Sequence, residues 1–580
     1  MKSTIEQLPD HLKKYVVDQN YGRYTSEDQA VWRYILKQLK SYLKVHAHET
    51  YVDGLEKTGI TLENIPRIED VDRKLKEFGW AAVPISGFIP PAAFMEFQSL
   101  GILPIASDIR TIDHIHYTPA PDIVHESAGH APILIDPKFS EYLRSYATVA
   151  KKAIFSREDL LLYEAIRELS DIKENPKSTP EEIKKHESNL QQVVASMRYI
   201  SEAAILARMN WWTAEYGLIG PVDDPKIFGA GLLSSVGEAR SCLQPSVEKI
   251  PLSVKCVDYA YDITEKQPQL FVAENFQRLI TVLEELSETM AYKKGGIYGL
   301  EKALESKTVN TVQLDSGLQI SGELESYKAQ NNEATFIKFL GPVQLCLEGA
   351  ELPGHGTNYH EGGYSTPLGA IKGSTAKPGK MKLHDLEALG IAKGKSVELT
   401  FESGVHVDGT VDDILTQKNG QVLLISFSHC RVYDDENTYF KPEWGIFDMA
   451  LGMSIPSVFG GPADRQAYGE TVDFVAKIIP DRKLTAEEKN LHQFYLDIRN
   501  LREGSLSESG RISQLQQLVD DYRENFTHHW LVGVELLELA FAFSADKEIV
   551  SEILNILEQQ KAANPENKVL IEDGIKLAQD

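Results

Sequence analysis

The sequence predicts a multidomain protein. A mainly α-helical N-terminal domain with short strands precedes a β-rich domain with an internal repeat, and a helical region follows. Length is the first observation, because 580 residues exceed what one hydrophobic core organises. The second is apolar periodicity, which is helical at first and changes to strand alternation beyond about residue 305. Charged amphipathic helices then return from Thr485. We therefore expect domains at residues 1–304, 305–480 and 481–580.

Helical patterning begins early in the chain. Residues 1–80 look helical, and from Thr25 onward apolar residues recur every four positions, which predicts a helix with one buried face. These apolar residues are Val31, Ile35, Leu39 and Leu43. Residues 80–115 bring short apolar runs separated by Gly and Pro, which predict loops and short strands around a cleft.

A charged helical segment covers residues 155–197. A turn at Asn175-Pro176 divides it, and its second half opens with Thr179-Pro-Glu-Glu, a capping box with proline at the first helical position. We expect an exposed antiparallel helical hairpin inserted at a loop, where extra residues cost little.

Strand alternation occurs twice in the second domain. Residues 312–324 alternate about a Ser-Gly turn, residues 397–411 repeat the pattern, and a further apolar run follows each. This predicts an internal duplication of a small β-barrel or hairpin unit.

The stretch between these units, residues 352–379, is rich in Gly, Pro and His. It contains His355, His360 and Glu361, but no apolar scaffold surrounds them and no third ligand is evident. We expect a solvated loop.

Composition and charge exclude several classes of partner. Hydrophobic and charged contents of 42% and 25% are typical of a soluble globular protein, and a net charge of −25 argues against nucleic acid or an anionic membrane as a partner. Four cysteines form no Cys-x-x-Cys pair and predict no disulfide framework. The first residues lack the apolar core of a signal peptide, so we expect a cytoplasmic protein.

The stretch from Tyr117 to His130 carries the chemistry. Prolines give it an extended lead-in, Asp122 stands where a helix N-cap would, and Gly129 can bend the short turn that follows. The result is two imidazoles, His125 and His130, with a carboxylate beside the first. Imidazole suits zinc, copper, iron and nickel, so the pair is a candidate metal site.

The spacing of the two histidines is unusual for a metal site. Five positions apart, they lie about 140° from each other around an ideal helix, so they converge only if the backbone bends, and Gly129 is the candidate for this bend. Alternatively, both imidazoles are satisfied by hydrogen bonds in a polar cleft.

Glu215 supplies a candidate third ligand. It lies in an apolar, aromatic helical stretch, where a buried carboxylate is costly unless it is paired or bound to a metal. Two histidines and one carboxylate form the facial triad of non-haem Fe(II) oxygenases. The alternative for Glu215 is a position on the helix surface.

Four motifs follow one another in the order that is typical of one known family. They are residues 117–130, then Trp211-x-Thr-Ala-Glu-Tyr-Gly-Leu, then residues 228–238 and finally Phe271-Val-Ala-Glu-Asn-Phe. With these motifs, residues 20–300 resemble the catalytic domain of the pterin-dependent aromatic amino-acid hydroxylases, most closely the bacterial phenylalanine 4-monooxygenases. The resemblance implies that fold for residues 1–304 and a monooxygenase that converts phenylalanine to tyrosine.

The resemblance also implies the cofactors and the site residues. Fe(II) would be held by His125, His130 and Glu215, with a tetrahydropterin, such as tetrahydrobiopterin, as reductant and O₂ as co-substrate. The substrate-binding residues would be Arg110, Thr118, Trp211 and Ser234. Phe97, Glu126 and the backbone near Ala207 would face the pterin.

Two other residues of these motifs bear on the site. Asn210 departs from the family, which usually carries an aromatic residue just before Trp211, and this affects the pterin side of the site. Glu238 is a candidate for orienting a ligand imidazole, with helix capping as its alternative role.

Other functions remain open at this point. The shared motifs also fit a tyrosine or tryptophan hydroxylase of the same family. A zinc hydrolase could use the same three ligands with Glu126 as general base, although the five-residue spacing weighs against it. A non-catalytic protein with a decayed site is the third alternative, although all three ligand types remain.

Overall fold

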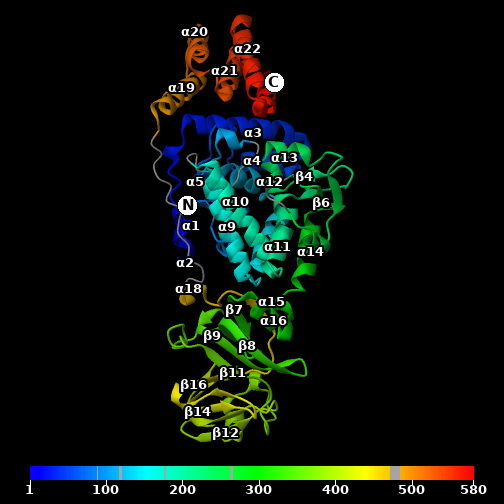
Figure 1. Cartoon of the computed structure of the whole chain (residues 1–580), viewed down its shortest axis with the longest axis vertical. Coiled ribbons are helices and arrows are strands. Elements are labelled where there is room, and N and C mark those ends of the chain that lie inside the picture. The colour runs from blue at the N-terminus through cyan, green and yellow to red at the C-terminus, as the bar shows by residue number, and fades with distance from the viewer. Residues whose placement is uncertain (88, 116–120, 175–177, 262–265, 470–483, 580) are drawn as a thin grey trace.

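The chain has three parts arranged along its long axis in the computed structural model (Figure 1). A central mainly helical domain lies between a β region at one end and the C-terminal helices at the other. The structure describes residues 1–579 except 88, 116–120, 175–177, 262–265 and 470–483. Within these ranges, no helix is long and apolar enough to cross a membrane.

The central domain is built around α3, Ser26–His46. Thr25 begins this helix because its side chain accepts a hydrogen bond from the backbone N–H of Asp28, whose carboxylate binds back to Thr25. All four apolar residues of the predicted stripe are buried, so the expected core-facing helix is confirmed. The other helices of this domain with nine or more residues are α6 (Pro91–Ser99), α8 (Pro137–Ala150), α9 (Arg157–Glu174), α10 (Pro180–Ser196), α11 (Glu202–Asn210) and α14 (Phe276–Ser287).

Two small sheets complete the central domain. One pairs β1 (Ala81–Ile85) with β2 (Ile102–Ala106) in parallel, and both are short strands of the kind predicted for residues 80–115. The other has the order β4-β3-β6-β5. Its strands are β3 (Leu218–Ile219), β4 (Lys226–Ile227), β5 (Glu248–Pro251) and β6 (Gln269–Ala273).

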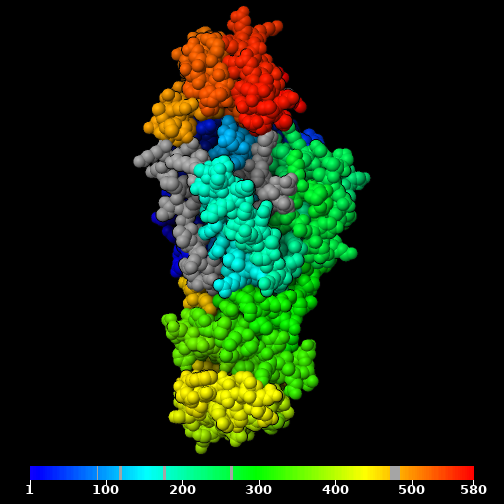
Figure 2. All heavy atoms as spheres, in the orientation of Figure 1, coloured from blue at the N-terminus to red at the C-terminus, as the bar shows by residue number. Residues whose placement is uncertain are grey.

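The inserted hairpin is present as α9 and α10. Thr179 caps α10 through the predicted capping box, with Pro180 at the first helical position. No residue of α10 is buried, and the cyan pair lies on the surface of the molecule (Figure 2). The turn predicted at residues 175 and 176 lies outside the described residues.

The β region contains two sheets of the same connectivity. Each is a three-stranded meander whose third strand also pairs with two short strands. The first meander is β7 (Val309–Gln313), β8 (Leu318–Gln330) and β9 (Glu333–Leu347), with β10 (Ala350–Glu351) and β11 (Tyr364–Pro367) on β9 and β17 (Ser457–Gly460) on β7. The second is β12 (Ser396–Thr400), β13 (His406–Thr416) and β14 (Val422–Tyr433), with β15 (Thr438–Phe440) and β16 (Phe447–Ala450) on β14.

The register shifts between paired strands occur at equivalent places in the two meanders, 87 positions apart in the sequence. The register between β8 and β9 shifts at Gly322, and that between β13 and β14 shifts at Gly409, which is 87 positions later. The next two register shifts, after Leu324 and Lys328 in the first meander, recur after Val411 and Leu415, again 87 positions later. A bulge leaves one residue unpaired at a defined place, so its repetition matches the duplication that the sequence predicts.

The boundary expected at residue 304 lies inside α16, Gly296–Ser306. Leu300 and Ala303 of this helix pack in the apolar cluster of the first β sheet. Met290 still belongs to the cluster of the central domain. Packing therefore changes from one core to the next near residue 290.

The C-terminal helices dock on α3 of the central domain. Arg33 is buried there, and its guanidinium donates to Glu538 at 2.8 Å and to Glu535 at 3.4 Å. Tyr34 donates to the carbonyl of Leu570 at 2.6 Å. One apolar cluster runs from α3 into these helices. The C-terminal helices are α19 (Ala486–Glu503), α20 (Glu508–Asp521), α21 (Trp530–Ala542), α22 (Lys547–Ala563) and α23 (Lys568–Gln579).

Candidate metal centre

A π-helical turn brings the two histidines together. Residues His125–His130 form this turn, in which hydrogen bonds join residues five apart, as from the N–H of Ala131 to the carbonyl of Glu126. Because one turn then holds more residues than an α-helical turn, side chains five apart lie on the same face. The convergence predicted for this pair is present, and its cause is the wider turn.

Gly129 has a different role from the predicted bend. It is not among the glycines with positive φ, so it does not reverse the chain. Instead, a Cβ at this position would lie 2.7 Å from the carbonyl oxygen of Ala230 in α12, Ala230–Leu233. Only glycine therefore lets α12 approach the turn this closely.

Glu215 ends a second π-helical turn, Trp211–Glu215. The N–H of Tyr216 donates to the carbonyl of Trp211 at 2.8 Å, again across five residues. A Cβ on Gly229 would lie 2.4 Å from the carbonyl oxygen of Glu215. The short helix α12 is thus packed between both π-turns through glycines, which explains the Gly-rich motif that follows Phe228.

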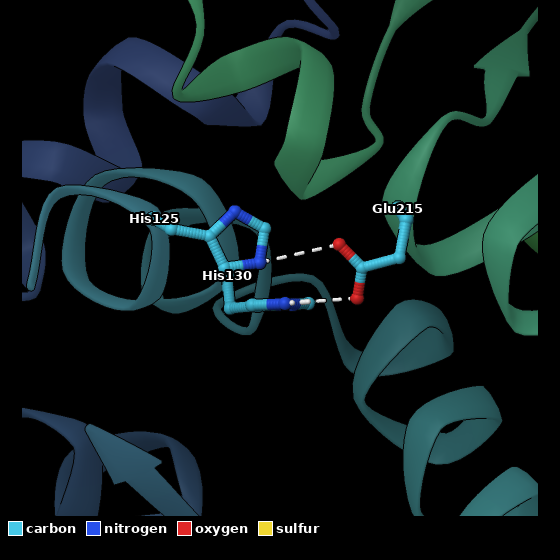
Figure 3. A group of neighbouring side chains, drawn as sticks. All are labelled: His125, His130 and Glu215. Atoms are coloured by element: carbon cyan, nitrogen blue, oxygen red, sulfur yellow. Dashed lines mark ion pairs between the residues drawn. The ribbon is translucent and has the colours of Figure 1, made fainter. Parts of the chain in front are cut away.

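The three predicted ligands converge on one point (Figure 3). His125 Nε2 lies 3.2 Å from one carboxylate oxygen of Glu215, and His130 Nε2 lies 3.2 Å from the other. Burial raises the pKa of Glu215, but the two imidazoles outweigh this effect and hold the pKa well below its usual range. Two imidazole nitrogens and an ionised carboxylate within 4.8 Å of one another fit a ferrous ion.

Asp122 fixes the start of the first π-turn. One of its carboxylate oxygens accepts from the backbone N–H of His125 at 3.0 Å, which is the predicted N-cap. Burial raises the pKa of Asp122, but the guanidinium of Arg110 outweighs this and lowers it below its usual range.

Arg110 is buried against this cap. Its Nε and Nη2 donate to the two oxygens of Asp122 at 2.7 and 2.8 Å, and its Nη1 donates to the carbonyl of Ser234 at 3.1 Å. A guanidinium has five N–H groups, so two of them have no partner among the described residues.

Ser234 sets the tautomer of His125. Its hydroxyl donates to the carbonyl of Ala230 at 2.7 Å and lies 3.1 Å from His125 Nδ1. Because the single hydroxyl proton is used on Ala230, the oxygen accepts from Nδ1–H, which leaves Nε2 unprotonated and facing Glu215. In the described part of the chain, the partner of this imidazole is therefore Ser234 and not Glu238.

Asn210 touches the carboxylate ligand. Its side-chain amide lies 3.4 Å from Glu215 Oε1 as donor, five residues away along the second π-turn. Glu126 is buried beside His125, and one of its carboxylate oxygens has no hydrogen-bond partner in the described part of the chain. Burial raises the pKa of Glu126 to about 8.

The remaining predicted residues lie in different surroundings. Trp211 is sandwiched between Tyr216 and Tyr261, at ring distances of 4.5 and 4.4 Å. Ala207 lies one turn earlier in α11, with its carbonyl accepting from the N–H of Trp211. Thr118 lies outside the described residues.

Phe97 does not fit the predicted stacking on a pterin. It is fully buried in α6 within a cluster that also contains Leu12 and Val83, so neither ring face is open to a ligand. The role of Phe97 was implied only by the resemblance to the family. Phe94, one turn earlier on the same helix, is the partly exposed aromatic ring.

A family model described as biopterin-dependent aromatic amino acid hydroxylase matches residues 7–151 and 186–315. The interval that it skips, residues 152–185, covers α9 and the start of α10, as expected for an insertion. The matched residues include all three candidate ligands.

The chain is also similar to individual proteins over about half of its length. The phenylalanine-4-hydroxylase of Mesorhizobium japonicum is 28% identical over 301 residues, which are 51% of this chain and 91% of that protein. The human phenylalanine-4-hydroxylase is 30% identical over 259 residues, 44% of this chain and 47% of that protein. A Chromobacterium violaceum phenylalanine hydroxylase crystallised with iron(III) and 7,8-dihydrobiopterin covers 49% of this chain and 92% of its own, at 24% identity and a TM-score of 0.38.

Proposed function

Because the N-terminal half of this chain belongs to the biopterin-dependent aromatic amino acid hydroxylases, we propose that it hydroxylates the ring of free phenylalanine to give tyrosine. The observation that carries the proposal is the convergence of His125, His130 and Glu215 inside the matched residues. The relatives are named phenylalanine-4-hydroxylases, which supports phenylalanine over the other aromatic amino acids.

These three side chains would hold ferrous iron on one side and leave its other positions open. When bound, the iron and a tetrahydropterin supply the activation of O₂ that ring hydroxylation needs. The chain itself positions the ligands. Asp122 caps the turn that carries both imidazoles, and Ser234 keeps His125 Nε2 available for the metal.

Arg110 is the residue proposed to bind the substrate carboxylate. Its guanidinium is held rigidly by Asp122 and Ser234, and its two remaining N–H groups can grip a carboxylate. Such a contact would be the same for every free amino acid, so Arg110 orients the substrate without selecting its side chain. Selection among aromatic rings is left to the shape of the ring pocket.

Neither alternative function is favoured. A zinc hydrolase with the same three ligands would not account for the match to hydroxylases across residues 7–151 and 186–315. A tyrosine or tryptophan hydroxylase shares the motifs, but the curated relatives compared above are phenylalanine-4-hydroxylases.

Turnover by the full chain tests the proposal. With Fe(II), tetrahydrobiopterin and air, we expect the highest kcat/KM for phenylalanine, with tyrosine as product measured by chromatography. His130→Ala should remove both bound iron and activity, because one of three ligands is lost. His46→Ala, which changes a histidine of α3 outside the site, is the matched control and should keep both.

Two results would contradict the proposal. A clear preference for tryptophan or tyrosine would overturn the substrate and leave the metal centre in place. Full activity of His130→Ala with iron still bound would overturn the ligand assignment itself.

A further inference from the structure

The loop between β10 and β11 contains a second group of metal-ligating side chains. The sequence predicts a solvated loop here with no third ligand, but the structure differs. His355 and His360 lie together with Asp448, and one ligating atom from each residue falls within 4.8 Å of the others. Glu361 is exposed and takes no part, whereas His360 and Asp448 are buried. The third residue was missed because it comes 88 positions after His360.

Backbone hydrogen bonds hold both histidines in place. The carbonyl of His355 accepts from the N–H of Leu345, and that of His360 accepts from the N–H of Val343, both in β9. The N–H of His360 itself donates to the carbonyl of Gly356 at 3.2 Å. The loop is therefore fastened to the first β sheet at the two residues whose imidazoles face each other.

Asp448 comes from the second β sheet. It lies in β16, and its carboxylate accepts from the hydroxyl of Ser426 in β14 at 2.5 Å. Its backbone carbonyl accepts from the hydroxyl of Tyr364 in β11 at 2.8 Å. The three candidate ligands thus meet at the junction of the two repeated units.

Among the residues that the structure describes, no lysine or arginine pairs with the carboxylate of Asp448. It is only 5% exposed, and among the described residues its side-chain partners are the hydroxyls of Ser426 and Tyr359. A buried carboxylate is costly unless a cation compensates its charge. The side chains beside Asp448 are the imidazoles of His355 and His360. Neutral imidazoles bind metal ions, and a metal ion held by them would supply the compensating positive charge.

The distances suit one shared ion. His355 Nδ1 lies 3.2 Å from His360 Nε2. Two imidazole nitrogens bound to one tetrahedral zinc ion, each at about 2.0–2.1 Å, are about 3.3–3.4 Å apart. A direct hydrogen bond between two neutral rings accounts for the same distance, but it brings no positive charge to Asp448.

We propose that His355, His360 and Asp448 bind a divalent transition-metal ion of the zinc type, which fastens the two β units to each other. Three protein ligands leave a further coordination position for water. The ion would connect the loop on β9 with β16, and its charge would compensate that of Asp448. This site is separate from the centre at His125, and it does not depend on the function of that centre.

Zinc binding by the full chain tests this proposal. In a His130→Ala background, which disables the first centre, titration with zinc against a chromophoric chelator should show one tight ion per chain. Adding His360→Ala should abolish this binding. His406→Ala, which removes a half-buried histidine of the same β region, is the matched control and should leave it unchanged.

Thermal unfolding gives a second measurement. Zinc should raise the Tm of the His130→Ala chain and leave the chain that also carries His360→Ala unaffected. If His360→Ala does not fold, His355→Ala serves instead, because its ring is less buried. Equal zinc binding with and without His360 and His355, or no zinc binding by the His130→Ala chain, would overturn the proposal. Loss of zinc binding when His360→Ala is added to the His130→Ala chain, together with unchanged phenylalanine turnover in His360→Ala alone, would support it.

Discussion

At the scale of single residues, Arg110 connects the ligand turn to the proposed substrate contact. It pairs with Asp122, whose carboxylate caps the turn of His125, and both side chains are almost fully buried. Removing Arg110 therefore leaves a buried carboxylate without a cation as well as removing two N–H groups from the site. A loss of activity in Arg110→Ala has both causes, so stability has to be measured together with KM.

We expect Arg110→Ala to lower the free energy of unfolding by about 3–5 kcal/mol at pH 7. The folded-state pKa of Asp122 is lowered, so the stability from this pair is present above the unfolded-state pKa of about 3.9 and is lost as pH falls through the folded-state pKa. The difference between the variant and the unchanged protein should therefore shrink in acid, as urea unfolding at pH 7 and pH 3 will show. Arg23→Ala breaks a more exposed pair with Asp108 and should cost about 1 kcal/mol or less. Equal losses in both variants would contradict the structural role of Arg110.

The ligand residues could be predicted from the sequence, whereas their geometry could not. His125, His130 and Glu215 stand in recognisable motifs, but five-residue spacing fits either a bend or a π-turn, and local sequence does not decide between them. Ser234 was expected to contact substrate, and its observed partner is His125. Asp448 was missed altogether, because its contact with His360 depends on how two sheets pack.

At the scale of elements, the hairpin of α9 and α10 is an addition with closely spaced ends. The N–H of Ala203, just after it, donates to the carbonyl of Ile154, just before it, at 3.1 Å. Ile154 also donates to the carboxylate of Glu202 at 3.2 Å. The chain enters and leaves the hairpin at one point, so the elements that carry the ligands do not depend on it for their spacing.

Replacing residues 157–199 with a short Gly-Ser linker should therefore preserve the metal centre. We expect iron content and phenylalanine turnover close to those of the full chain, with a small loss of stability because α9 buries Ala165 and Leu169. Metal analysis and thermal unfolding of the purified variant measure both. A soluble variant that binds no iron would show that the hairpin takes part in forming the site.

Among the features of the helices and strands, the first residues of helices were predicted best from the sequence. Helices were expected to begin at Thr25, Thr179 and Thr485, and in the structure a capping box begins a helix one residue after each. These starts are predictable because the threonine hydroxyl and its carboxylate partner lie within four residues of each other. The strands of the β region follow from equally local patterns. Which faces these elements bury against one another is set by distant residues.

At the scale of the whole molecule, the C-terminal helices and the central domain share one apolar cluster. Their contact includes the buried pair between Arg33 and Glu535, which are 502 positions apart. No local pattern indicates such a contact, so the sequence predicts the bundle but not its docking surface. The central domain contains every candidate iron ligand, and the docked helices cover the opposite side of α3 from its own core.

A fragment of residues 1–290 should fold and bind iron at the first centre, because the ligands, Asp122 and Ser234 all lie inside it. We expect a lower Tm than that of the full chain, since the face of α3 with Tyr34 loses its cover. A fragment of residues 1–304 should be less soluble, because α16 then exposes Leu300 and Ala303. Expression, metal analysis and thermal unfolding of both fragments test this. An insoluble or iron-free 1–290 fragment would mean that the other regions complete its core.

The register shifts of the two meanders are 87 positions apart, and this offset identifies residues at equivalent positions in the two units. Tyr364 pairs with Phe339 in the first unit, and Asp448 pairs with Ser426, which is 87 positions after Phe339, in the second. Tyr364 and Asp448 are therefore counterparts, and they meet at the junction through the hydroxyl of one and the carbonyl of the other. Two identical copies could place only two phenols or two carboxylates there. Because the pair consists of one tyrosine and one aspartate, the junction of the two units carries a single cluster of candidate ligands, which includes Asp448 but not Tyr364.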